Sequence, residues 1–206
     1  FRQIWSELGG TLSGSLREGV VPASARDILQ WKSAALAEQI RDINKFSNNV
    51  MARQLLLTMA AERSSVPATA AAASALVQSW MNANGIPAPE LMLENGSGLS
   101  RNERISAATM ARVLQRAWQS PTMPEFVASL PIAGIDGTMK KRVQALGVMG
   151  NAHIKTGSLA DVASMAGYVT ARSGRRLLVV CMVNHANAGA MRAGFDLLLQ
   201  WVYENG

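Results

Sequence analysis

The stretches that decide the fold read AHIKTGS at residues 152–158, ASMAGYVTA at 163–171 and LLVVCMV at 177–183. Each run is rich in apolar and β-branched residues, so the sequence predicts three successive strands. Residues 172–175 read RSGR, and the Ser-Gly centre is typical of a tight turn, so the second and third strands should form an antiparallel hairpin. The run at 177–183 has no polar alternation, which indicates a strand covered on both faces by helices.

Helical patterns surround this predicted sheet. Apolar residues recur at helical spacing in most of these segments, and one of them is rich in alanine. The segments are 34–45, a helix through Met51, Leu55 and Met59, then 68–84 and 106–119, and a closing helix through Met191, Phe195, Leu198 and Val202. We therefore expect a mixed α/β (α+β) fold in which helices cover an antiparallel sheet.

Composition limits the possible functions. The chain has 206 residues, of which 49% are hydrophobic and 17% charged, enough for one substantial domain or part of one. One cysteine, Cys181, and two histidines, His153 and His185, leave too few ligands for a typical protein metal site, so neither a metal nor another cofactor is expected.

The net charge of +6 favours contact with anionic polymers in general but names no partner. The basic residues are dispersed and lack interleaved aromatic residues, so nucleic acid is not expected as a partner. No run of 18 apolar residues is present, and no transmembrane segment is expected. The chain opens on Phe1 rather than Met, which we interpret as a fragment or a processed product. The Gly- and Ser-rich stretch 9–19 suggests a boundary that separates residues 1–19 from residues 20–206.

Two short motifs could carry chemistry. Lys155-Thr156-Gly157-Ser158 ends the first predicted strand and offers a fixed positive charge, hydroxyl donors and a backbone that a ligand can approach closely at Gly157. Residues 47–49 read Ser-Asn-Asn, with a hydroxyl and a carboxamide at a junction between two helices. Alone, the first motif is more often a surface turn and the second a helix cap.

Together and in this order, the two motifs belong to the active-site set of penicillin-recognising serine acyltransferases, which a Ser-x-x-Lys completes. The chain resembles the low-molecular-mass class C penicillin-binding proteins, the D-alanyl-D-alanine carboxypeptidase/endopeptidases of bacterial cell walls. Four blocks carry the resemblance in the family's order: DINKFSNN at 42–49, NGSGLSR at 95–101, LPIAGIDGT at 130–138 and KTGSL at 155–159. It implies the C-terminal portion of a penicillin-binding/β-lactamase-like transpeptidase fold, with residues 1–19 ending an upstream accessory region and 20–206 forming part of the catalytic domain.

The resemblance also implies roles for individual residues. Ser47 would pass a proton to the departing D-alanine nitrogen, and Asn49 would orient the nucleophile's lysine and the substrate amide. Lys155 would hold positive potential beside Ser47. Thr156 and Ser158 would bind the substrate carboxylate through their hydroxyls, and the Ser158 N–H would form half of an oxyanion hole. Strict strand alternation places Lys155 and Thr156 on opposite faces, so both can meet one ligand only at a twisted sheet edge.

The family's nucleophile motif is missing from this sequence. The residues three positions before its five lysines are Leu29, Asp42, Gly137, Thr138 and Ala152, so no Ser-x-x-Lys occurs. Only Thr138 before Lys141 imitates it, inside another matched block. We expect the nucleophile and the accessory insertions to precede Phe1, and this chain alone to be inactive.

The resemblance implies a peptidoglycan stem peptide ending in D-Ala-D-Ala and β-lactam antibiotics as ligands, the N-terminal part of the same enzyme as a partner, and a periplasmic location. Two alternatives stay open. The chain could be a non-catalytic peptide- or wall-binding module, or, with less support, part of a serine β-lactamase. Rival nucleophile or base assignments to Ser97, His153 or His185 have weaker sequence context, and Cys181 is expected to be buried and inert.

Overall fold

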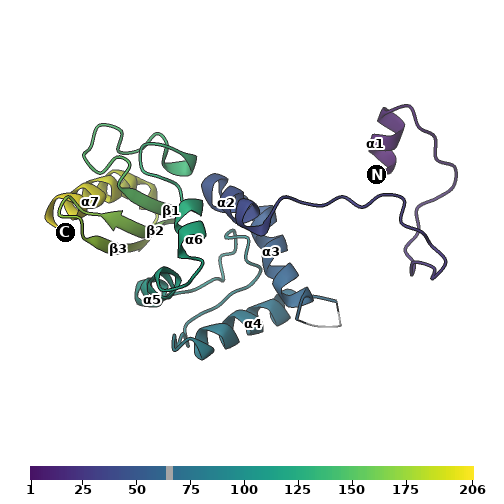
Figure 1. Cartoon of the computed structure of the whole chain (residues 1–206), viewed down its shortest axis with the longest axis horizontal. Coiled ribbons are helices and arrows are strands. Elements are labelled where there is room, and N and C mark those ends of the chain that lie inside the picture. The colour runs from purple at the N-terminus through teal and green to yellow at the C-terminus, as the bar shows by residue number, and fades with distance from the viewer. Residues whose placement is uncertain (64–66) are drawn as a thin grey trace. The chain divides into compact units, whose positions relative to one another are not determined.

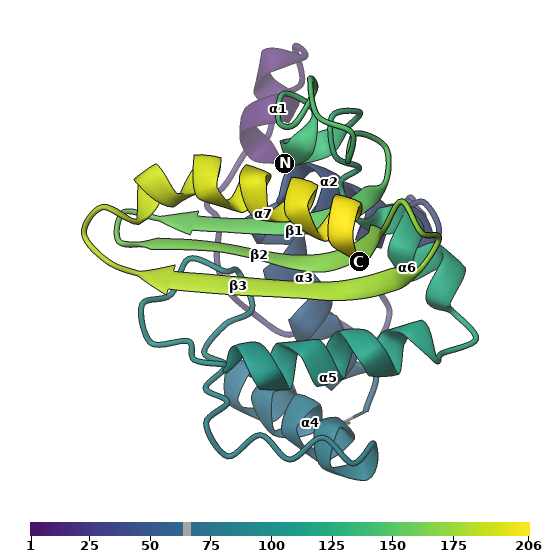
Figure 2. The same ribbon diagram turned by 90° about the vertical axis from the view of Figure 1, so that its left-hand side faces the viewer.

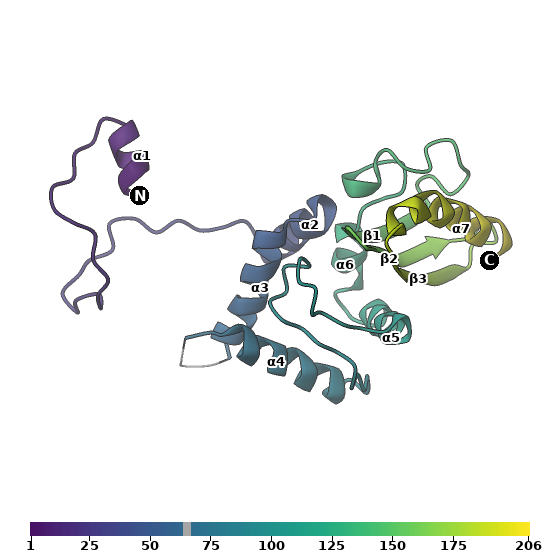
Figure 3. The ribbon, with the colours of Figure 1, turned by 180° about the vertical axis from the view of Figure 1, so that it is seen from behind.

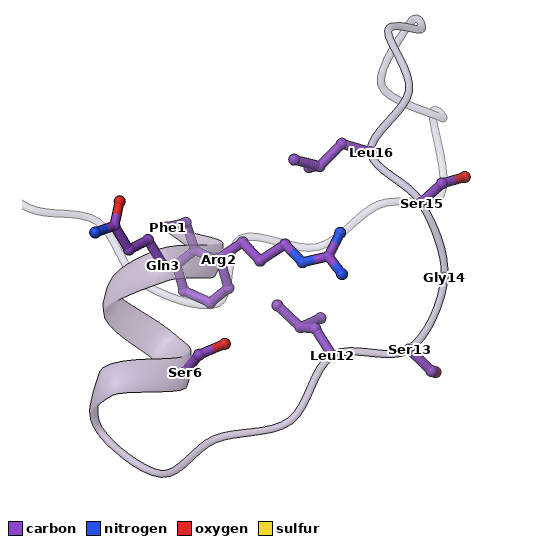
Figure 4. Close-up of a pocket in the computed structure, with 9 residues that line it drawn as sticks. All are labelled: Phe1, Arg2, Gln3, Ser6, Leu12, Ser13, Gly14, Ser15 and Leu16. Atoms are coloured by element: carbon purple, nitrogen blue, oxygen red, sulfur yellow. The ribbon is translucent and has the colours of Figure 1, made fainter.

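The computed structural model describes residues 1–63 and 67–206 and divides into two compact units, Phe1–Ser33 and Ala34–Gly206 (Figure 1). The first unit begins with the short helix α1 (Arg2–Glu7), where the Phe1 ring stacks on Trp5 with centroids 5.6 Å apart. A hollow of about 720 Å³ lies in this unit. Figure 4 shows that the Arg2 side chain extends between Leu12 and Leu16, which line this hollow. The boundary expected after residue 19 lies inside this unit and stays a prediction.

The second unit contains an antiparallel sheet in the order β1-β2-β3. Its strands are β1 (Ala152–Leu159), β2 (Val162–Thr170) and β3 (Arg176–Asn184), as the three apolar runs predict. The register pairs Lys155 with Ala166 and Gly157 with Ser164. Gly174 adopts φ 86° in the β2–β3 connection, a left-handed conformation that glycine adopts without steric cost, and the predicted hairpin is confirmed.

The two faces of β2 pack against different helices, because side chains alternate along a strand. Met165 and Val169 belong to the main core, which α7 (Met191–Asn205) completes with Phe195 and Leu199. Tyr168 packs on the opposite face with Leu114 and Leu130. Figure 2 shows α7 lying along one side of the sheet and α5 (Ala107–Trp118) on the other. The mixed α and antiparallel β architecture is therefore as expected.

Helices lie on both sides of the sheet as expected, but they cover β3 only in part. Val179 is buried, but its neighbours along β3 are half-buried or exposed, and Leu178 is 38% exposed. The physical reason is the position of β3 at an edge of the three-stranded sheet, where α7 and α5 each reach only part of the strand. Cys181 on this strand is half-buried rather than buried, and partial burial raises the pKa of its thiol.

The second unit begins with the helices α2 (Leu36–Phe46), α3 (Asn49–Ala61) and α4 (Ala70–Ala83) (Figure 3). Asn48 and Thr69 cap α3 and α4 by accepting hydrogen bonds from backbone N–H groups three residues later, and Ser106 does the same for α5. Leu56 and Ala60 of α3 meet Ala73 of α4 in a separate small core. The helices predicted through Met51, Leu55 and Met59 and over 68–84 are confirmed.

The segment between α5 and β1 contains elements that the sequence pattern did not predict. Pro121 and Pro124 follow the helix predicted over 106–119, and α6 (Met123–Ser129) begins there, since proline fits the first turn of a helix. A short 3₁₀ turn, η1 (Gly137–Met139), follows, and a second, η2 (Ala188–Ala190), precedes α7. Along residues 1–63 and 67–206, every helix is too short or too polar to cross a lipid bilayer.

Candidate active site

The Ser47 corner is a tight junction between α2 and α3. Ser47 itself adopts φ 55° and ψ 48°, a left-handed conformation that costs a non-glycine residue about 1–3 kcal/mol and persists only where its surroundings impose it. Asn48 then caps α3 through the Met51 N–H at 3.0 Å, and Asn49 donates its side-chain amide to the Ser97 carbonyl. The corner is therefore held by the cap of α3 and by the bond of Asn49 to the Ser97 carbonyl.

A buried ion pair holds α2 directly before this corner. Lys45 is 7% exposed, and its Nζ donates to the Leu130 carbonyl and to Asp136 Oδ2, each at 2.7 Å. Asp136 Oδ1 accepts from the Ile132 N–H at 2.7 Å, so one carboxylate connects α2 to the 130–136 loop. A buried lysine is tolerated only when its charge is paired in this way.

The same loop runs along the outer edge of β1. The Ala133 N–H donates to the Ala152 carbonyl at 2.9 Å, and the Ile154 N–H donates to the Pro131 carbonyl at 2.8 Å. Backbone groups alternate in direction along a strand, so those of Thr156 and Ser158 face the same outer edge as those of Ile154. In the described part of the chain, this edge has no backbone partner from Thr156 onward.

Lys155 brings the two predicted motifs together at the point where the edge opens. Its Nζ donates to Ser47 Oγ at 2.9 Å and to the Thr156 carbonyl at 2.7 Å. The second bond draws the ammonium group to the strand edge, while the Lys155 and Thr156 side chains stay on opposite faces as strand alternation requires. Burial lowers the pKa of Lys155, because desolvation disfavours the charged amine.

The hydroxyl groups of the Lys-Thr-Gly-Ser motif lie on the other face of β1. Thr156 Oγ1 is 3.0 Å from Thr138 Oγ1 of η1, and Ser158 Oγ accepts from Arg192 Nη2 of α7 at 3.2 Å. Between them, Gly157 faces the Ser164 side chain of β2 so closely that a β-carbon would collide with its hydroxyl. A larger residue at position 157 would therefore force the Ser164 hydroxyl to move.

Beside Lys155, a cavity of about 240 Å³ opens on the α5 and α6 side of the sheet. Its walls are mainly apolar, and Lys155, Thr156 and Gly157 supply part of its rim. A lysine and outward-facing backbone amides beside an apolar hollow can hold an extended peptide, and the Thr156 and Ser158 hydroxyls lie on the opposite face of the same strand. The larger hollow near Phe1 lacks this combination and belongs to the other unit.

The other candidate residues make structural contacts. Ser97 accepts from the Leu99 N–H through its hydroxyl, and its carbonyl receives Asn49. His153 Nδ1 is 3.1 Å from the Val127 carbonyl, and partial burial lowers the pKa of this imidazole. His185 Nδ1 accepts from the Asn187 N–H at 3.0 Å.

Three residues around the site were not singled out from the sequence: Lys45, Asp136 and Arg192. Thr138 was considered only as an imitation of the nucleophile serine, and the structure places its hydroxyl 3.0 Å from that of Thr156. Lys45 and Asp136 lie in two of the matched blocks, so opposite charges in separate blocks were a usable signal for the ion pair. Arg192 lies in the closing helix, far along the chain from Ser158, and only the folded chain shows their contact.

Comparison with known proteins identifies the family. The model of the family described as D-Ala-D-Ala carboxypeptidase 3 (S13) matches residues 1–203. The chain belongs to this S13 family. It is 30% identical to the D-alanyl-D-alanine carboxypeptidase of Actinomadura sp. (strain R39) over 92% of this chain and 36% of that protein. It is 27% identical to the D-alanyl-D-alanine carboxypeptidase DacB of Haemophilus influenzae over 91% of this chain and 40% of that protein.

Solved structures support the fold of this S13 chain. Penicillin-binding protein 4 (dacB) of Haemophilus influenzae, complexed with a novel β-lactam, superposes with a TM-score of 0.85 at 26% identity, covering 98% of this chain and 48% of that one. A β-lactamase from Chitinophaga pinensis shares the fold with a TM-score of 0.60 at 17% identity, covering 82% of this chain and 64% of that one. The predicted family and the penicillin-binding fold are confirmed. The chain spans about 40% of the length of the curated relatives it matches.

Proposed function

We propose that this chain provides the Ser-x-Asn and Lys-Thr-Gly elements of a serine DD-peptidase, a D-alanyl-D-alanine carboxypeptidase/endopeptidase. The observation that carries the proposal is the 2.9 Å contact between Lys155 Nζ and Ser47 Oγ beside the open edge of β1. A Ser-x-x-Lys segment outside this chain would supply the nucleophile. This agrees with the match to the Actinomadura carboxypeptidase, which covers only 36% of that protein's length.

In the proposed reaction, the serine of that segment attacks the carbonyl of the D-Ala-D-Ala bond and forms an acyl-enzyme that water resolves. Ser47 relays a proton to the departing amine, and the ammonium of Lys155 at 2.9 Å supports this relay electrostatically. The lowered pKa of Lys155 makes it easier for this group to share its proton with Ser47. Asn49, on the first turn of α3, would orient the nucleophile's lysine and the substrate amide.

The substrate would add to β1 as an extra strand, because the backbone groups of Thr156 and Ser158 face the open edge. The Ser158 N–H would supply half of the oxyanion hole, and the absence of a side chain at Gly157 would let the peptide approach. The proposed ligands are a peptidoglycan stem peptide ending in D-Ala-D-Ala and β-lactam antibiotics. A wall substrate of this kind implies a periplasmic location, and the partner is the N-terminal part of the same enzyme.

The test replaces Lys155 in the protein that carries this chain together with its Ser-x-x-Lys segment. Lys155→Ala should slow acylation by a fluorescent penicillin ~10²-fold or more, the usual scale for a group that stabilises charge in a transition state. Lys141→Ala removes the same charge from an exposed position and should label at the wild-type rate. Equal labelling of the Lys155→Ala variant and wild type would refute the assignment of Lys155.

Intact-mass analysis after exposure to benzylpenicillin separates the enzyme from a binding module. The 206-residue chain alone should gain no covalent adduct, because its sequence has no Ser-x-x-Lys. The protein with its Ser-x-x-Lys segment should gain one penicilloyl group. An adduct on the chain alone would contradict the proposed source of the nucleophile, and no adduct on either protein would favour the binding module.

A further inference from the structure

An arginine from the closing helix lies against the hydroxyl end of the Lys-Thr-Gly-Ser motif. Arg192 is the second residue of α7, and its Nη2 donates to Ser158 Oγ at 3.2 Å. The side chain is exposed, so its remaining donors can meet a ligand from solvent. Along β1, Ser158 is on the same face as Thr156, whose hydroxyl lies 3.0 Å from Thr138.

The position of Arg192 is fixed by a second arginine. Arg142 Nη2 donates to the Arg192 carbonyl at 3.0 Å and to Asp196 Oδ1 at 2.6 Å. The side chains of Arg142 and Asp196 are 18% and 25% exposed, which makes this ion pair mostly buried. Arg142 thus anchors the first turn of α7 and holds the backbone of Arg192 beside the end of β1.

This arrangement leaves the charge of Arg192 without a counter-ion. Asp196, one helical turn further along, is engaged by Arg142, and no carboxylate pairs with Arg192 among the ion pairs of residues 1–63 and 67–206. Guanidinium groups bind carboxylates with paired N–H donors, and such charge-assisted bonds are roughly twice as strong as neutral ones. An unpaired guanidinium next to two hydroxyls is therefore a receptor for a small anion.

We propose that Arg192 is a specificity-determining residue that binds the terminal carboxylate of the substrate together with the hydroxyls of Thr156 and Ser158. This inference rests on the proposed function. The carboxylate would lie beside the Arg192 guanidinium, on the hydroxyl face of β1, where the donors of Arg192 that Ser158 does not use can reach it. Lys155, which points to the other face toward Ser47, would then serve mainly the proton relay. In this arrangement, Lys155 serves the reaction and Arg192 selects substrates that end in a free carboxylate.

A pair of ligands that differ only in the carboxylate tests the proposal. The first measurement is equilibrium binding of N-acetyl-D-alanine and of its amide, which requires no turnover and no nucleophile. The protein should bind the acid more tightly than the amide, and Arg192→Ala should lower the affinity for the acid about tenfold. The affinity for the amide should change less than about twofold, because the amide carries no charge for Arg192 to recognise.

Three variants make the result specific. Arg192→Lys keeps the charge without the paired donors and should retain part of the acid preference. Arg175→Ala removes an arginine from the β2–β3 turn and should leave both affinities unchanged. Ser158→Ala should weaken acid binding, since it removes a hydroxyl that Arg192 contacts. Equal losses for acid and amide in Arg192→Ala, or no loss for the acid, would overturn the proposal.

A kinetic measurement distinguishes this proposal from the proposed function. With the Ser-x-x-Lys segment present, Arg192→Ala should lower kcat/KM about tenfold for a peptide ending in D-Ala-D-Ala. For the corresponding C-terminal amide, kcat/KM should hardly change. If wild type hydrolyses neither peptide but binds the acid through Arg192, the proposed function fails and the carboxylate site stands. If hydrolysis proceeds and Arg192→Ala reduces both substrates equally, the carboxylate site fails alone.

Discussion

The two halves of β1 have the same backbone pairing to β2 but different surroundings on their other edge. In the first half, Ala152 and Ile154 are fully buried, and their outward backbone groups bond to the 131–133 segment. In the second half, Thr156, Gly157 and Ser158 are partly or fully exposed along an edge that the described chain leaves open. We call residues 152–154 the closed half and residues 156–158 the open half. The closed half fixes the strand in the fold, and the open half can bind a ligand along its edge without loss of existing backbone hydrogen bonds.

Lys155 stands at the transition between the halves and joins the strand to the Ser47 corner. The 130–136 loop determines where that transition occurs, because it covers the edge up to Ile154 and is tied to α2 by Lys45 and Asp136. This comparison implies that changes in the closed half should affect stability, whereas changes in the open half should affect ligand binding and acylation.

The largest stability effect is expected for Ile154→Ala in the closed half. Ile154 is 0% exposed within the main core, so the substitution leaves a cavity and should cost about 3 kcal/mol in the free energy of unfolding. Urea denaturation measures this change, with Thr156→Ala in the open half as the matched variant. A loss from Thr156→Ala as large as that from Ile154→Ala would show that the two halves do not differ as described.

A smaller loss of stability is expected when the 130–136 loop, which covers the edge of the closed half, loses its ion pair with α2. Asp136→Asn removes the charge that pairs with Lys45 and should cost about 2 kcal/mol, because Lys45 remains buried while the carboxylate was itself partly exposed. The same variant should slow β-lactam acylation by displacing Ser47 from Lys155. The double variant Lys45→Met with Asp136→Asn should recover part of the stability. A wild-type unfolding midpoint for Asp136→Asn would contradict the role of this ion pair.

The smallest expected effect is the pH dependence of stability that Tyr168 causes. Tyr168 of β2 lies opposite His153 in the closed half of β1. Tyr168 is 4% exposed and donates to the Leu114 carbonyl at 2.7 Å, and burial raises its pKa to about 12. A raised pKa stabilises the folded protein below the ordinary value near 10, and this contribution is lost as pH rises through 10 toward 12.

Between pH 9 and 11 this group should therefore account for a loss of about 1 kcal/mol of stability. The corresponding experiment compares thermal unfolding of wild type and Tyr168→Phe across that range. The phenylalanine variant should be less stable at pH 8 but should decline less toward pH 11. Parallel declines in the two proteins would mean that Tyr168 does not titrate in the way its burial requires.

Much of the local structure could be predicted from the sequence, since it depends on neighbouring residues. The three β-type runs, the Ser173-Gly174 turn and the helix caps at Asn48 and Ser106 each act within a few residues. The α6 helix was not predicted, because a proline is typical both of the end of one helix and of the first turn of the next. The coverage of β3 was overestimated because an apolar run does not reveal whether the strand is central or at an edge.

The sequence by itself determined the residue types of the site, the alternation along β1 and the family to which the chain belongs. Only the tertiary structure decided that Lys155 turns toward Ser47, that Lys45 is buried against Asp136 and that Arg192 meets Ser158. The physical reason is that each of these contacts joins segments far apart in the chain. Their geometry is set by how the helices pack on the two faces of the sheet, whereas local propensity acts only over a turn or a strand pair.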